Sequence, residues 1–437
     1  MGALVPIILT SRPDSERTHV ASRAVAVWGD DRRGRSGLMP GAVLALNAGS
    51  SSVKFALYEI SPGDSLALVL YGVLEGIGTE PHFAARNALG AIVGERRWPP
   101  GSTATHEALL GGMLDWIEQH LGADALVAVG HRVVHGGREF FAPIRLNGEV
   151  MQALEKLAPL APLHQPHSLS PVRAIMTLRP GLPQIACFDT AFHRTMPAVA
   201  TRFALPREFE MEGVRRYGFH GLSYEYIARA LRETAPHLAS EHVIVAHLGN
   251  GASLCAMRDG CSIDTTMGFT ALDGLVMGTR CGTLDAGVVL YMLQQKSLAA
   301  HEVEQILYQR SGLLGVSCLS SDMRTLLASA DPHAREAVEL FVFRIAREVA
   351  ALTGSLGGVE GIVFTAGIGE HAAAVRALVC ERLRWLGVIL DPEANARDAP
   401  IISAADSPVE VRVIPTDEER MIALHTLEVV GLARKAK

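Results

Sequence analysis

VLALNAGSSSVKFALYE, at residues 43–59, opens a dense and glycine-punctuated stretch of the chain. Its pattern predicts an apolar β-strand, a glycine/serine turn and a second strand of alternating character. A related segment, VIVAHLGNGASLCAMRDG, follows at residues 243–260. The matching residues are Gly49 with Gly249, Ser51 with Gly251, and Ala56 with Ala256. The two segments have few identical residues, so these matches alone could arise by chance. Their shared strand–turn–strand design favours an internal duplication.

Helices and strands alternate through the later part of the chain. Residues 334–356 are apolar at helical spacing and end near Gly357, which predicts a long helix. An apolar strand at 361–365 precedes the turn AGIGE and a further helix. Near the end, the strand VEVRVIP leads into a helix, and Thr416 and Glu419 have the T-x-x-E spacing of a capping box. We therefore predict an α/β protein with two similar halves facing a cleft.

Composition narrows the class of protein. The chain has 437 residues, 49% of them hydrophobic and 20% charged, as expected of a globular protein with two or three domains. Its 40 basic and 46 acidic residues give a net charge of -6, which argues against a nucleic-acid or anionic-membrane surface. The six cysteines form no CxxC pair, which favours reduced thiols in the cytoplasm. We find no apolar run long enough to predict a membrane span.

The first forty residues differ from the rest, because they are rich in arginine and interrupted by acidic residues. Transit peptides are poor in acidic residues, and the apolar run VPIILT is too short for a secretory signal. We expect residues 1–40 to be a disordered extension, or Met39 to be the natural start.

Four glycine-rich clusters could bind phosphate, because glycine lets backbone N–H groups approach phosphate oxygens closely. Each cluster taken alone is more often a tight hairpin or a helix cap, and neither the Walker A nor the G-x-G-x-x-G pattern is present. Several clusters after strands, with Lys54 and Arg280 nearby, favour nucleotide phosphate binding. The clusters are NAGSSS, HLGNG, GTRCG and AGIGE.

Histidines in HRVVHGG and LHQPHSL raise a metal hypothesis: these are His131, His135, His164 and His167. Zinc sites prefer histidine pairs on one helix face or Cys/His clusters, whereas RVV is typical of a strand. We therefore favour packing or hydrogen-bonding histidines over zinc. Arg132, in the same segment, is a better candidate for a site residue, because a guanidinium can bind a carboxylate or a phosphate through two hydrogen bonds.

Three further residues lie where chemistry could occur. Asp189 in FDTAFH follows an apolar strand, and His220 lies between aromatic and glycine residues in YGFHG. Each alone is more often structural, as a cap or turn for Asp189 and as a core histidine for His220. Arg280, flanked by glycine and small residues, suits stabilisation of transition-state charge.

Together these segments resemble the acetate kinase family, of the acetate and sugar kinase/heat-shock/actin superfamily. The resemblance runs from Val43 to about Leu427. Its motifs, in chain order, are NAGSSSVKF, GHRVVHGG, PLAPLHQPHSL, FDTAFHRTMP, YGFHGLS, AHLGNG, MGTRCG, SSDMR, TAGIGEH and PTDEE.

The resemblance implies two duplicated ribonuclease H-like domains, as in actin-like ATPases, and a homodimer. It implies an N-terminal domain at 41–192 that binds acyl substrate and metal, with 418–437 returning to it, and a nucleotide-binding domain at 193–417. It also implies reversible phosphorylation of acetate by ATP with Mg²⁺, for which Mn²⁺ could substitute.

Site residues follow from the resemblance position by position. Asn47 and a glutamate of TDEE resemble the metal site, and the capping-box spacing assigns Glu419 to the helix and leaves Glu418 for the metal. Arg132 resembles the acyl-substrate residue, His220 and Arg280 resemble residues that stabilise the transferring phosphoryl group, and Asp189 resembles the catalytic acid. The implied nucleotide contacts are Lys54, His247, Leu248, Gly249, Asn250, Gly251, Asp322, Met323, Arg324, Gly367, Ile368, Gly369, Glu370 and His371.

Chemistry constrains the role of Asp189. A carboxylic acid is already an anion near pH 7, so an acetate acceptor needs no general base. The obstacle is the approach of two anions and the charge on the transferring group, which Arg132, Arg280, Mg²⁺ and His220 would relieve. We expect Asp189 to orient an arginine or a metal-bound water, and transfer to be in line without a phosphoenzyme.

The acyl pocket departs from the family pattern. Val134, Leu163 and Phe219 resemble its wall, but Ala271 stands where proline is usual, so an extra methylene could fit and we expect propionate to be used. His371 stands where asparagine is usual. A propionate or butyrate kinase is an alternative that the sequence leaves open. A sugar kinase is less consistent with Arg132 and Arg280. An actin- or chaperone-like ATPase would need a polymer or peptide interface, which nothing in the sequence suggests.

Overall fold

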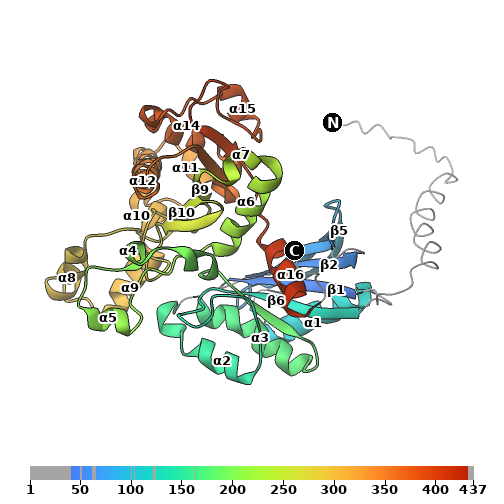
Figure 1. Cartoon of the computed structure of the whole chain (residues 1–437). Coiled ribbons are helices and arrows are strands. Elements are labelled where there is room, and N and C mark those ends of the chain that lie inside the picture. The colour runs from blue at the N-terminus through green and yellow to red at the C-terminus, as the bar shows by residue number, and fades with distance from the viewer. Residues whose placement is uncertain are drawn as a thin grey trace, which may run out of the picture. The chain divides into compact units, whose positions relative to one another are not determined.

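The fold contains two β-sheets (Figure 1). A core of five strands has the same order in both. The computed structural model describes residues 41–49, 52–61, 65–99, 101–102, 104–121, 125–162 and 164–431. The extension at 1–40 and Leu163 lie outside the described residues.

The first sheet runs β5-β4-β3-β2-β1-β6-β8-β7, and the second runs β11-β10-β9-β12-β13. In the first sheet, β5 to β1 are antiparallel neighbours, β6 and β8 run parallel to β1, and β7 is antiparallel to β8. In the second sheet, β11, β10 and β9 are antiparallel neighbours, and β12 and β13 run parallel to β9. The core β3-β2-β1-β6-β8 therefore has the same order and strand directions as β11-β10-β9-β12-β13. The predicted duplication is therefore confirmed in the topology. The strands are β1 (Gly41–Ala48), β2 (Ser52–Ser61), β3 (Ser65–Glu75), β4 (His82–Asn87), β5 (Ile92–Arg97), β6 (Ala125–Val133), β7 (Ile144–Arg145), β8 (Gln184–Phe188), β9 (His242–Leu248), β10 (Ala252–Arg258), β11 (Cys261–Thr265), β12 (Gly361–Thr365) and β13 (Glu410–Val413).

Sixteen α-helices are assigned within the described residues. They are α1 (His106–Leu121), α2 (Gly148–Glu155), α3 (Gln165–Leu178), α4 (Ala198–Thr201), α5 (Arg207–Met211), α6 (Gly221–Thr234), α7 (Pro236–Ala239), α8 (Ala286–Gln294), α9 (Ala300–Gln309), α10 (Gly312–Ser317), α11 (Met323–Ala328), α12 (Pro332–Leu356), α13 (Ala366–His371), α14 (Ala373–Arg382), α15 (Pro392–Ala396) and α16 (Glu418–Val429). The helix predicted at 334–356 is confirmed as α12, which ends at Gly357 in the left-handed conformation.

The two hairpins differ in one detail of register. Asn47 pairs with Lys54 across β1 and β2, whereas His247 pairs with Ser253 across β9 and β10. The second turn is therefore one residue shorter, and every later residue of β10 moves by one position. The match of Ala56 with Ala256 is wrong for this reason, because Ala256 occupies the ladder position of Leu57.

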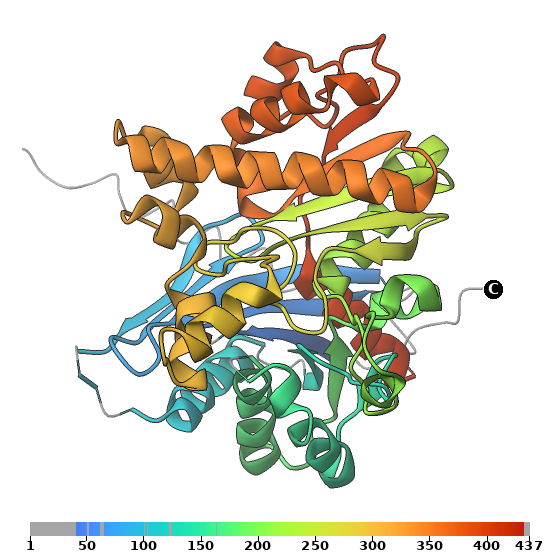
Figure 2. The same cartoon turned by 90° about the vertical axis from the view of Figure 1, so that its left-hand side faces the viewer.

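Alternation along the central strands places helices on both faces of each sheet. In β1, Leu44 and Leu46 pack on α1 and α3, while Val43 and Ala45 pack on α16. In β9, the even-numbered residues from Ile244 onward pack on α12 and α14, and the odd-numbered residues pack on α6. Figure 2 shows the long helix α12 across the second sheet.

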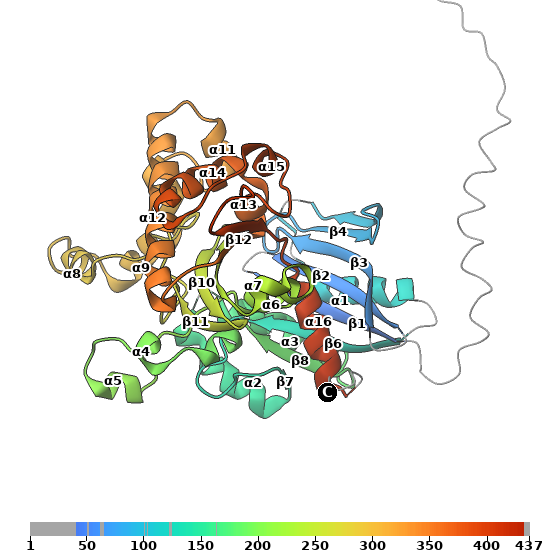
Figure 3. The same ribbon diagram turned by 45° about the horizontal axis from the view of Figure 1, so that its top comes forward.

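Helices α6 and α16 pack against each other between the two sheets (Figure 3). Helix α16 belongs to the core of the first sheet although it follows the last strand of the second sheet in the chain. Residues 41–437 form one compact unit. The domain limits at 41–192 and 193–417 therefore remain a prediction.

Two local predictions need correction. Residues 366–371, predicted as the turn AGIGE, form helix α13, whose first residue Ala366 has a φ of 63°. The cap of α16 is Asp417, whose side chain accepts the N–H of Arg420, so the capping box assigned to Thr416 and Glu419 is wrong. The carboxylate of Asp417 reaches the helix first, which frees the Glu419 side chain for another contact.

The six cysteines are free thiols. Among the described residues, none of the helices has the length and apolar character that crossing a lipid bilayer would need.

Candidate active site

A buried ion pair joins the ends of two neighbouring parallel strands. Arg132 lies near the end of β6, and Asp189 directly follows β8. The Nε of Arg132 donates to both carboxylate oxygens of Asp189 at 3.0 Å, and its Nη2 donates to Oδ2 at 2.5 Å. Asp189 is 1% exposed. The contact orients the guanidinium, which is the role expected for Asp189.

The remaining nitrogen of Arg132 reaches the metal-site candidates. Its Nη1 donates to Oδ1 of Asn47 at 3.1 Å. The Nδ2 of Asn47 in turn donates to Glu418 at 2.9 Å and to Glu419 at 3.1 Å. Both glutamates therefore face Asn47, and the capping argument that separated Glu418 from Glu419 no longer holds.

Burial and charge act against each other in this cluster. Burial raises the pKa of Asp189 above its ordinary value, although the adjacent Arg132 opposes the shift. Burial would lower the pKa of Arg132, but Asp189 and Glu418 outweigh it, so the pKa is raised and the guanidinium stays charged. Burial, with the neighbouring charge of Glu418, raises the pKa of Glu419. Two crowded carboxylates are a fitting site for a hard divalent cation.

His220 caps α6 in a left-handed conformation with a φ of 59°. The following residue, Gly221, donates its N–H to the carbonyl of Asp189 at 2.9 Å, and a Cβ there would lie 2.1 Å from that oxygen. Glycine is therefore required at 221 for the two segments to meet. This contact brings the backbone of His220 beside the Arg132–Asp189 pair.

A hydrogen-bonded chain defines the state of the His220 ring. Nδ1 of His220 lies 2.8 Å from Oγ of Ser253, which lies 2.5 Å from the hydroxyl of Tyr224. Burial, then the charges of neighbouring groups that include Arg132 and Arg280, hold the pKa of His220 well below its ordinary value. The ring is thus neutral at pH 7. If Tyr224 donates to Ser253 and Ser253 donates to Nδ1, the proton of His220 is on Nε2.

His247, at the end of β9, stacks on His220 with ring centroids 4.1 Å apart. Its Nδ1 lies 2.8 Å from Oγ of Ser223. Burial lowers the pKa of His247 to about 3, and Arg132 and Lys54 are near enough to contribute to the shift. Side chains from both sheets therefore converge here.

Arg280 is a partly buried cation held by a backbone carbonyl. Its Nη1 donates to the carbonyl of Ala271 at 2.6 Å. Burial lowers the pKa of Arg280 to about 10, and the charge of Arg132 adds to the shift, so the guanidiniums are close. A Cβ on Gly251 would lie 3.0 Å from Nη2 of Arg280 and 3.3 Å from Nε2 of His220. The three groups therefore border one space.

The predicted acyl-pocket residues lie in one apolar cluster: Val134, Phe219 and Ala271 are 3%, 1% and 8% exposed. Because Arg280 donates to the carbonyl of Ala271, this cluster adjoins the cationic group. Leu163, the fourth predicted member, lies outside the described residues.

Several predicted nucleotide segments meet at the turn after β9. A Cβ on Gly278 would clash with Oδ1 of Asn250 at 2.0 Å and lie 3.4 Å from Ser321. A Cβ on Gly249 would lie 3.8 Å from the Cβ of Ala366, where α13 begins. The segments at 247–251, 320–324 and 366–371 are thus brought together.

The polar side chains of these segments differ in exposure and pairing. Asp322 caps α11, and its carboxylate forms an exposed ion pair with Arg324 at 2.6 Å. Glu370 accepts the N–H of Thr416 at 3.1 Å, while the neighbouring His371 is exposed. Lys54 lies on the other sheet, and it is close enough to Glu419 to lower its pKa against the larger effect of burial.

Sequence reasoning missed three residues of this constellation. Glu419 was assigned to a cap, and Ser253 carried no signal beyond lying on a predicted strand. His164 was predicted to be a packing or hydrogen-bonding histidine rather than a zinc ligand, yet burial, Arg280 and Arg132 lower its pKa to about 3. Two of the other histidines form hydrogen bonds as expected: His131 lies 2.8 Å from Oε1 of Gln184, and His135 accepts the N–H of Gly137.

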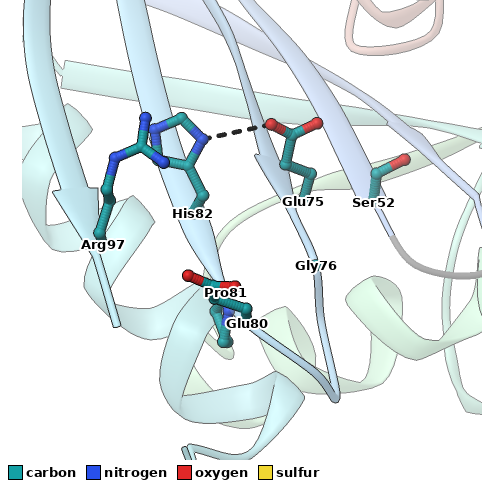
Figure 4. A pocket seen from close by; sticks show the side chains of 7 residues that line it. All are labelled: Ser52, Glu75, Gly76, Glu80, Pro81, His82 and Arg97. Carbon is teal, nitrogen blue, oxygen red and sulfur yellow. Dashed lines mark hydrogen bonds and ion pairs between the residues drawn. The ribbon is translucent and has the colours of Figure 1, made fainter. Parts of the chain in front are cut away.

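A polar cavity of about 430 Å³ lies at the edge of the first sheet, between β3, β4 and β5 (Figure 4). In it, His82 bridges Glu75 at 3.2 Å and Glu95 at 3.0 Å. Its lining includes Ser52 but none of the predicted site residues. The candidate active site is therefore not this cavity; it is the cluster of converging side chains described above.

The duplicated sheets, with polar and charged groups of both halves converging, define a two-domain protein of the actin-like ATPase fold. The model of the acetokinase family matches residues 42–424, and the chain belongs to this family.

Relatives and solved structures agree with this assignment. The acetate kinase of Rhodopseudomonas palustris (strain ATCC BAA-98 / CGA009) is 56% identical over 391 residues, which cover 89% of this chain and 98% of that protein. A propionate kinase structure from Francisella tularensis subsp. tularensis SCHU S4 superposes with a TM-score of 0.82 at 36% identity, over 89% of this chain and 100% of that one. The structure of Porphyromonas gingivalis acetate kinase gives 0.78 at 36% identity, with the same coverage.

Proposed function

We propose that the chain is a kinase that reversibly transfers the γ-phosphoryl group of ATP to acetate, giving acetyl phosphate and ADP. Family membership and the names of its relatives support the reaction class and the acceptor. The resemblance also favours a cytoplasmic enzyme, and the free cysteines fit a reducing compartment.

The observation that carries the proposal is the pairing state of the two guanidiniums. Arg132 is already neutralised by Asp189, whereas Arg280 contacts only a carbonyl among the described residues. A partly buried cation without a carboxylate is costly until an anion approaches it. The phosphoryl donor supplies that charge at Arg280, and a carboxylate acceptor adds a second anion beside Arg132, which a neutral hydroxyl acceptor would not.

Each residue then has a role that needs no proton removal from the acceptor. Arg132, held by Asp189, binds the acetate carboxylate beside the apolar cluster that takes the methyl group. Arg280 and the Nε2–H of neutral His220 donate to the equatorial oxygens of the transferring group, where charge accumulates. In-line attack by the carboxylate oxygen forms the new P–O bond as the bond to the β-phosphate oxygen breaks. ADP leaves with that electron pair.

Glu418, Glu419 and Asn47 would hold Mg²⁺, since carboxylate and amide oxygens are the ligands it prefers. The raised pKa of Glu419 beside Glu418 fits a site that is relieved by a cation. Bound there, the ion would neutralise phosphate charge. Asn47 now donates to both carboxylates, which holds them together on one side of Arg132.

Trapping of the acyl phosphate tests the proposal. The purified protein is incubated with Mg·ATP and acetate, propionate or butyrate, and hydroxylamine converts the product to a coloured hydroxamate. We expect the highest kcat/KM with acetate, and loss of the signal in Arg280→Ala, which controls for host kinases. Folded protein that forms no hydroxamate from any of the acids would refute the assignment.

Direct transfer has its own test. Incubation with [γ-³²P]ATP but no acetate should leave no protein-bound phosphate that disappears at the catalytic rate when acetate is added. A labelled residue that turns over at that rate would replace direct transfer by a phosphoenzyme.

A propionate kinase is the second candidate, and the residue at 271 favours it. Ala271 lies in the apolar cluster where a proline would occupy more space, and its carbonyl holds Arg280. The similar Francisella structure carries the name propionate kinase. The ratio of kcat/KM for the two acids in the hydroxamate assay decides between them.

We also infer a homodimer, because α8 and the residues just before it expose several apolar side chains. Their exposed fractions run from 36% to 52%, and no helix residue of α8 is buried. The residues are Leu284, Val288, Leu290, Tyr291 and Leu293. Light scattering should give a dimer mass for the intact chain and a monomer mass for Leu290→Glu; an unchanged mass would remove α8 from the interface.

A further inference from the structure

A second cavity lies apart from the residues of the candidate active site. It has a volume of about 290 Å³ and is lined by the 141–143 loop, the end of β8 with the following 3₁₀ helix, α6, the turn before β11, and α16. None of the residues placed above in catalysis or in substrate binding lines it. Parts of both sheets therefore contribute to one open cavity of the size that holds a small molecule.

Three arginines line this cavity: Arg194, Arg229 and Arg232. All three are exposed, and none forms an ion pair or a side-chain hydrogen bond with a residue that the structure describes. The Nη2 of Arg232 lies 2.9 Å from where a Cβ on Gly260 would be, so glycine leaves room for that guanidinium at the cavity. Three cations in so small a space repel one another unless an anion lies between them.

Two glutamates at or near the cavity interact with a histidine, His425. Glu225, which also lines the cavity, lies 2.9 Å from Nε2 of His425, and Glu428 lies 3.5 Å from its Nδ1. Burial alone would lower the pKa of His425, but the hydrogen bonds with these two glutamates raise it to about 9. His425 is therefore charged at pH 7 and offsets one of the two glutamates. The pKa of Glu428 is lowered first by its hydrogen bond with His425, and Arg229 is near enough to add to the shift, so the charge of Arg229 is partly offset. Arg194 and Arg232 remain without a carboxylate partner among the described residues.

Apolar and aromatic residues form another part of the lining. Phe188 and Leu222 are buried, and Phe192 is partly buried. Phe141 is 54% exposed, although it is a large apolar residue. A bare inorganic anion would use the arginines and leave these rings in water, and a neutral apolar molecule would leave the arginines unpaired. The arginines and the apolar residues of the lining together suit a molecule that has an anionic group and a ring or a short apolar body.

We propose that this cavity is a binding site for a small organic anion, a phosphate or carboxylate carried on an apolar ring-sized body. The anionic group binds between Arg194, Arg229 and Arg232, and the apolar body lies on Phe141 and Phe192. The proposal is independent of the function proposed above, since it uses no residue of that site. It has one structural link to it, because α6 lines the cavity and His220 is the N-cap residue of that helix.

Phenyl phosphate is a suitable probe, with calorimetry on the intact chain as the measurement. We expect it to bind more tightly than either inorganic phosphate or benzyl alcohol, and binding to weaken at least about tenfold in the double variant Arg229→Gln/Arg232→Gln. Arg335→Gln, which removes an exposed arginine of α12, is the matched control and should bind as the unmodified chain does.

The active site itself could bind a phosphate ester, so Arg280→Ala distinguishes the two locations. Binding that survives Arg280→Ala and weakens in the double variant supports the cavity. Binding lost in Arg280→Ala but kept in the double variant overturns the proposal, as does equal affinity for inorganic phosphate. If the double variant does not fold, Arg194→Gln takes its place.

A thiol readout tests the same proposal without any variant. Cys261 lines the cavity and is exposed, whereas Cys318 is exposed elsewhere. Phenyl phosphate should slow the alkylation of Cys261 by iodoacetamide at least threefold and leave Cys318 unchanged, as measured by peptide mass spectrometry. Unchanged alkylation of Cys261 at saturating probe would refute the assignment of the ligand to this cavity.

Discussion

The two sheets share a strand order but differ in what they present at the same ladder positions. At the end of the first hairpin, Asn47 faces Lys54. At the corresponding place in the second hairpin, His247 faces Ser253, and the turn is one residue shorter. The first sheet thus carries a cation and an amide where the second carries a neutral imidazole and a hydroxyl.

The same contrast continues on the neighbouring strands. Arg132 and Asp189 form an ion pair at the first sheet, and their counterparts by register are Thr365 and Thr416. The hydroxyls of both threonines are buried and have no hydrogen-bond partner within the described residues. At these matching ladder positions, one sheet therefore presents charged side chains and the other presents uncharged ones. Charge is concentrated where an acyl anion would bind, and small groups lie where the backbone could approach a nucleotide.

The largest loss of activity should follow from removing the guanidinium of Arg132. Arg132→Ala removes the two-point grip on Asp189 and the contact with Asn47, so kcat/KM for acetate should fall about 10³-fold. The counterpart Thr365→Val, which deletes an unpartnered hydroxyl, should change the KM for acetate less than about twofold. Steady-state kinetics for both variants test the contrast.

The stability of the Arg132→Ala variant needs its own control, because the substitution leaves the buried Asp189 carboxylate unpaired. Thermal unfolding would reveal a variant that melts below the assay temperature, and Arg132→Lys would then replace it. Equal losses in the arginine and threonine variants would mean that the two halves do not differ in function.

Acid should destabilise both halves, since each buries neutral histidines. Burial lowers the pKa of His131 and His193 to about 4 and that of His247 to about 3, all below the value of about 6.5 in the unfolded chain. Below pH 6.5 the unfolded state therefore binds more protons, and stability falls as the pH falls. Between pH 7.5 and 5.5 we expect a loss of about 1 kcal/mol per histidine, measured by urea denaturation.

His131→Asn offers the matching variant, because asparagine can still bond to Gln184 but does not titrate. Its free energy of unfolding should depend less steeply on pH by about one proton. An unchanged slope would mean that His131 is not neutral in the folded protein.

A smaller effect should come from Ser253, which stands where the first hairpin has Lys54. Ser253→Ala removes the partner of Nδ1, so the proton of His220 is no longer held on Nε2, and kcat should fall about tenfold. Ser253 is a positioning residue, so the KM for ATP should stay within about twofold. Tyr224→Phe should have a weaker effect, because the serine hydroxyl can still donate to His220. A Ser253→Ala enzyme with full kcat would exclude the relay.

The smallest effect concerns Ala271. Restoring the bulk with Ala271→Pro should exclude one buried methylene, worth about 0.8 kcal/mol, and lower the propionate/acetate ratio of kcat/KM about fourfold. The carbonyl that holds Arg280 is kept by proline, so the KM for ATP should not change. A ratio that does not fall would locate the acyl specificity elsewhere in the apolar cluster.

Much of the fold could be predicted from residues close in sequence. The strands around 43–59 and the helix at 334–356 have periodic apolar patterns, and glycine marks where each element ends. The errors arose where neighbouring residues compete for the same role. Asp417 displaced Thr416 as the cap of α16, and the shorter second turn moved Ala256 out of register.

The candidate site was harder to predict, because its members are far apart in the chain. Asn47 contacts Glu418 across 371 residues, and no local pattern signals that contact. Glu419 and His164 were assigned to other roles because their partners could not be seen in the sequence. Motif resemblance located most of the polar residues, but not how they pair.

The amino-acid sequence by itself determined the duplicated hairpins, the alternation of helices and strands, and which charged residues were available, because these depend on local periodicity and residue type. Only the tertiary structure decided which groups are buried and charged, which hydroxyls lie beside the histidine nitrogens, and which carboxylates share a neighbour. Those properties depend on burial and on distances between residues that are remote in sequence, and no local pattern encodes them.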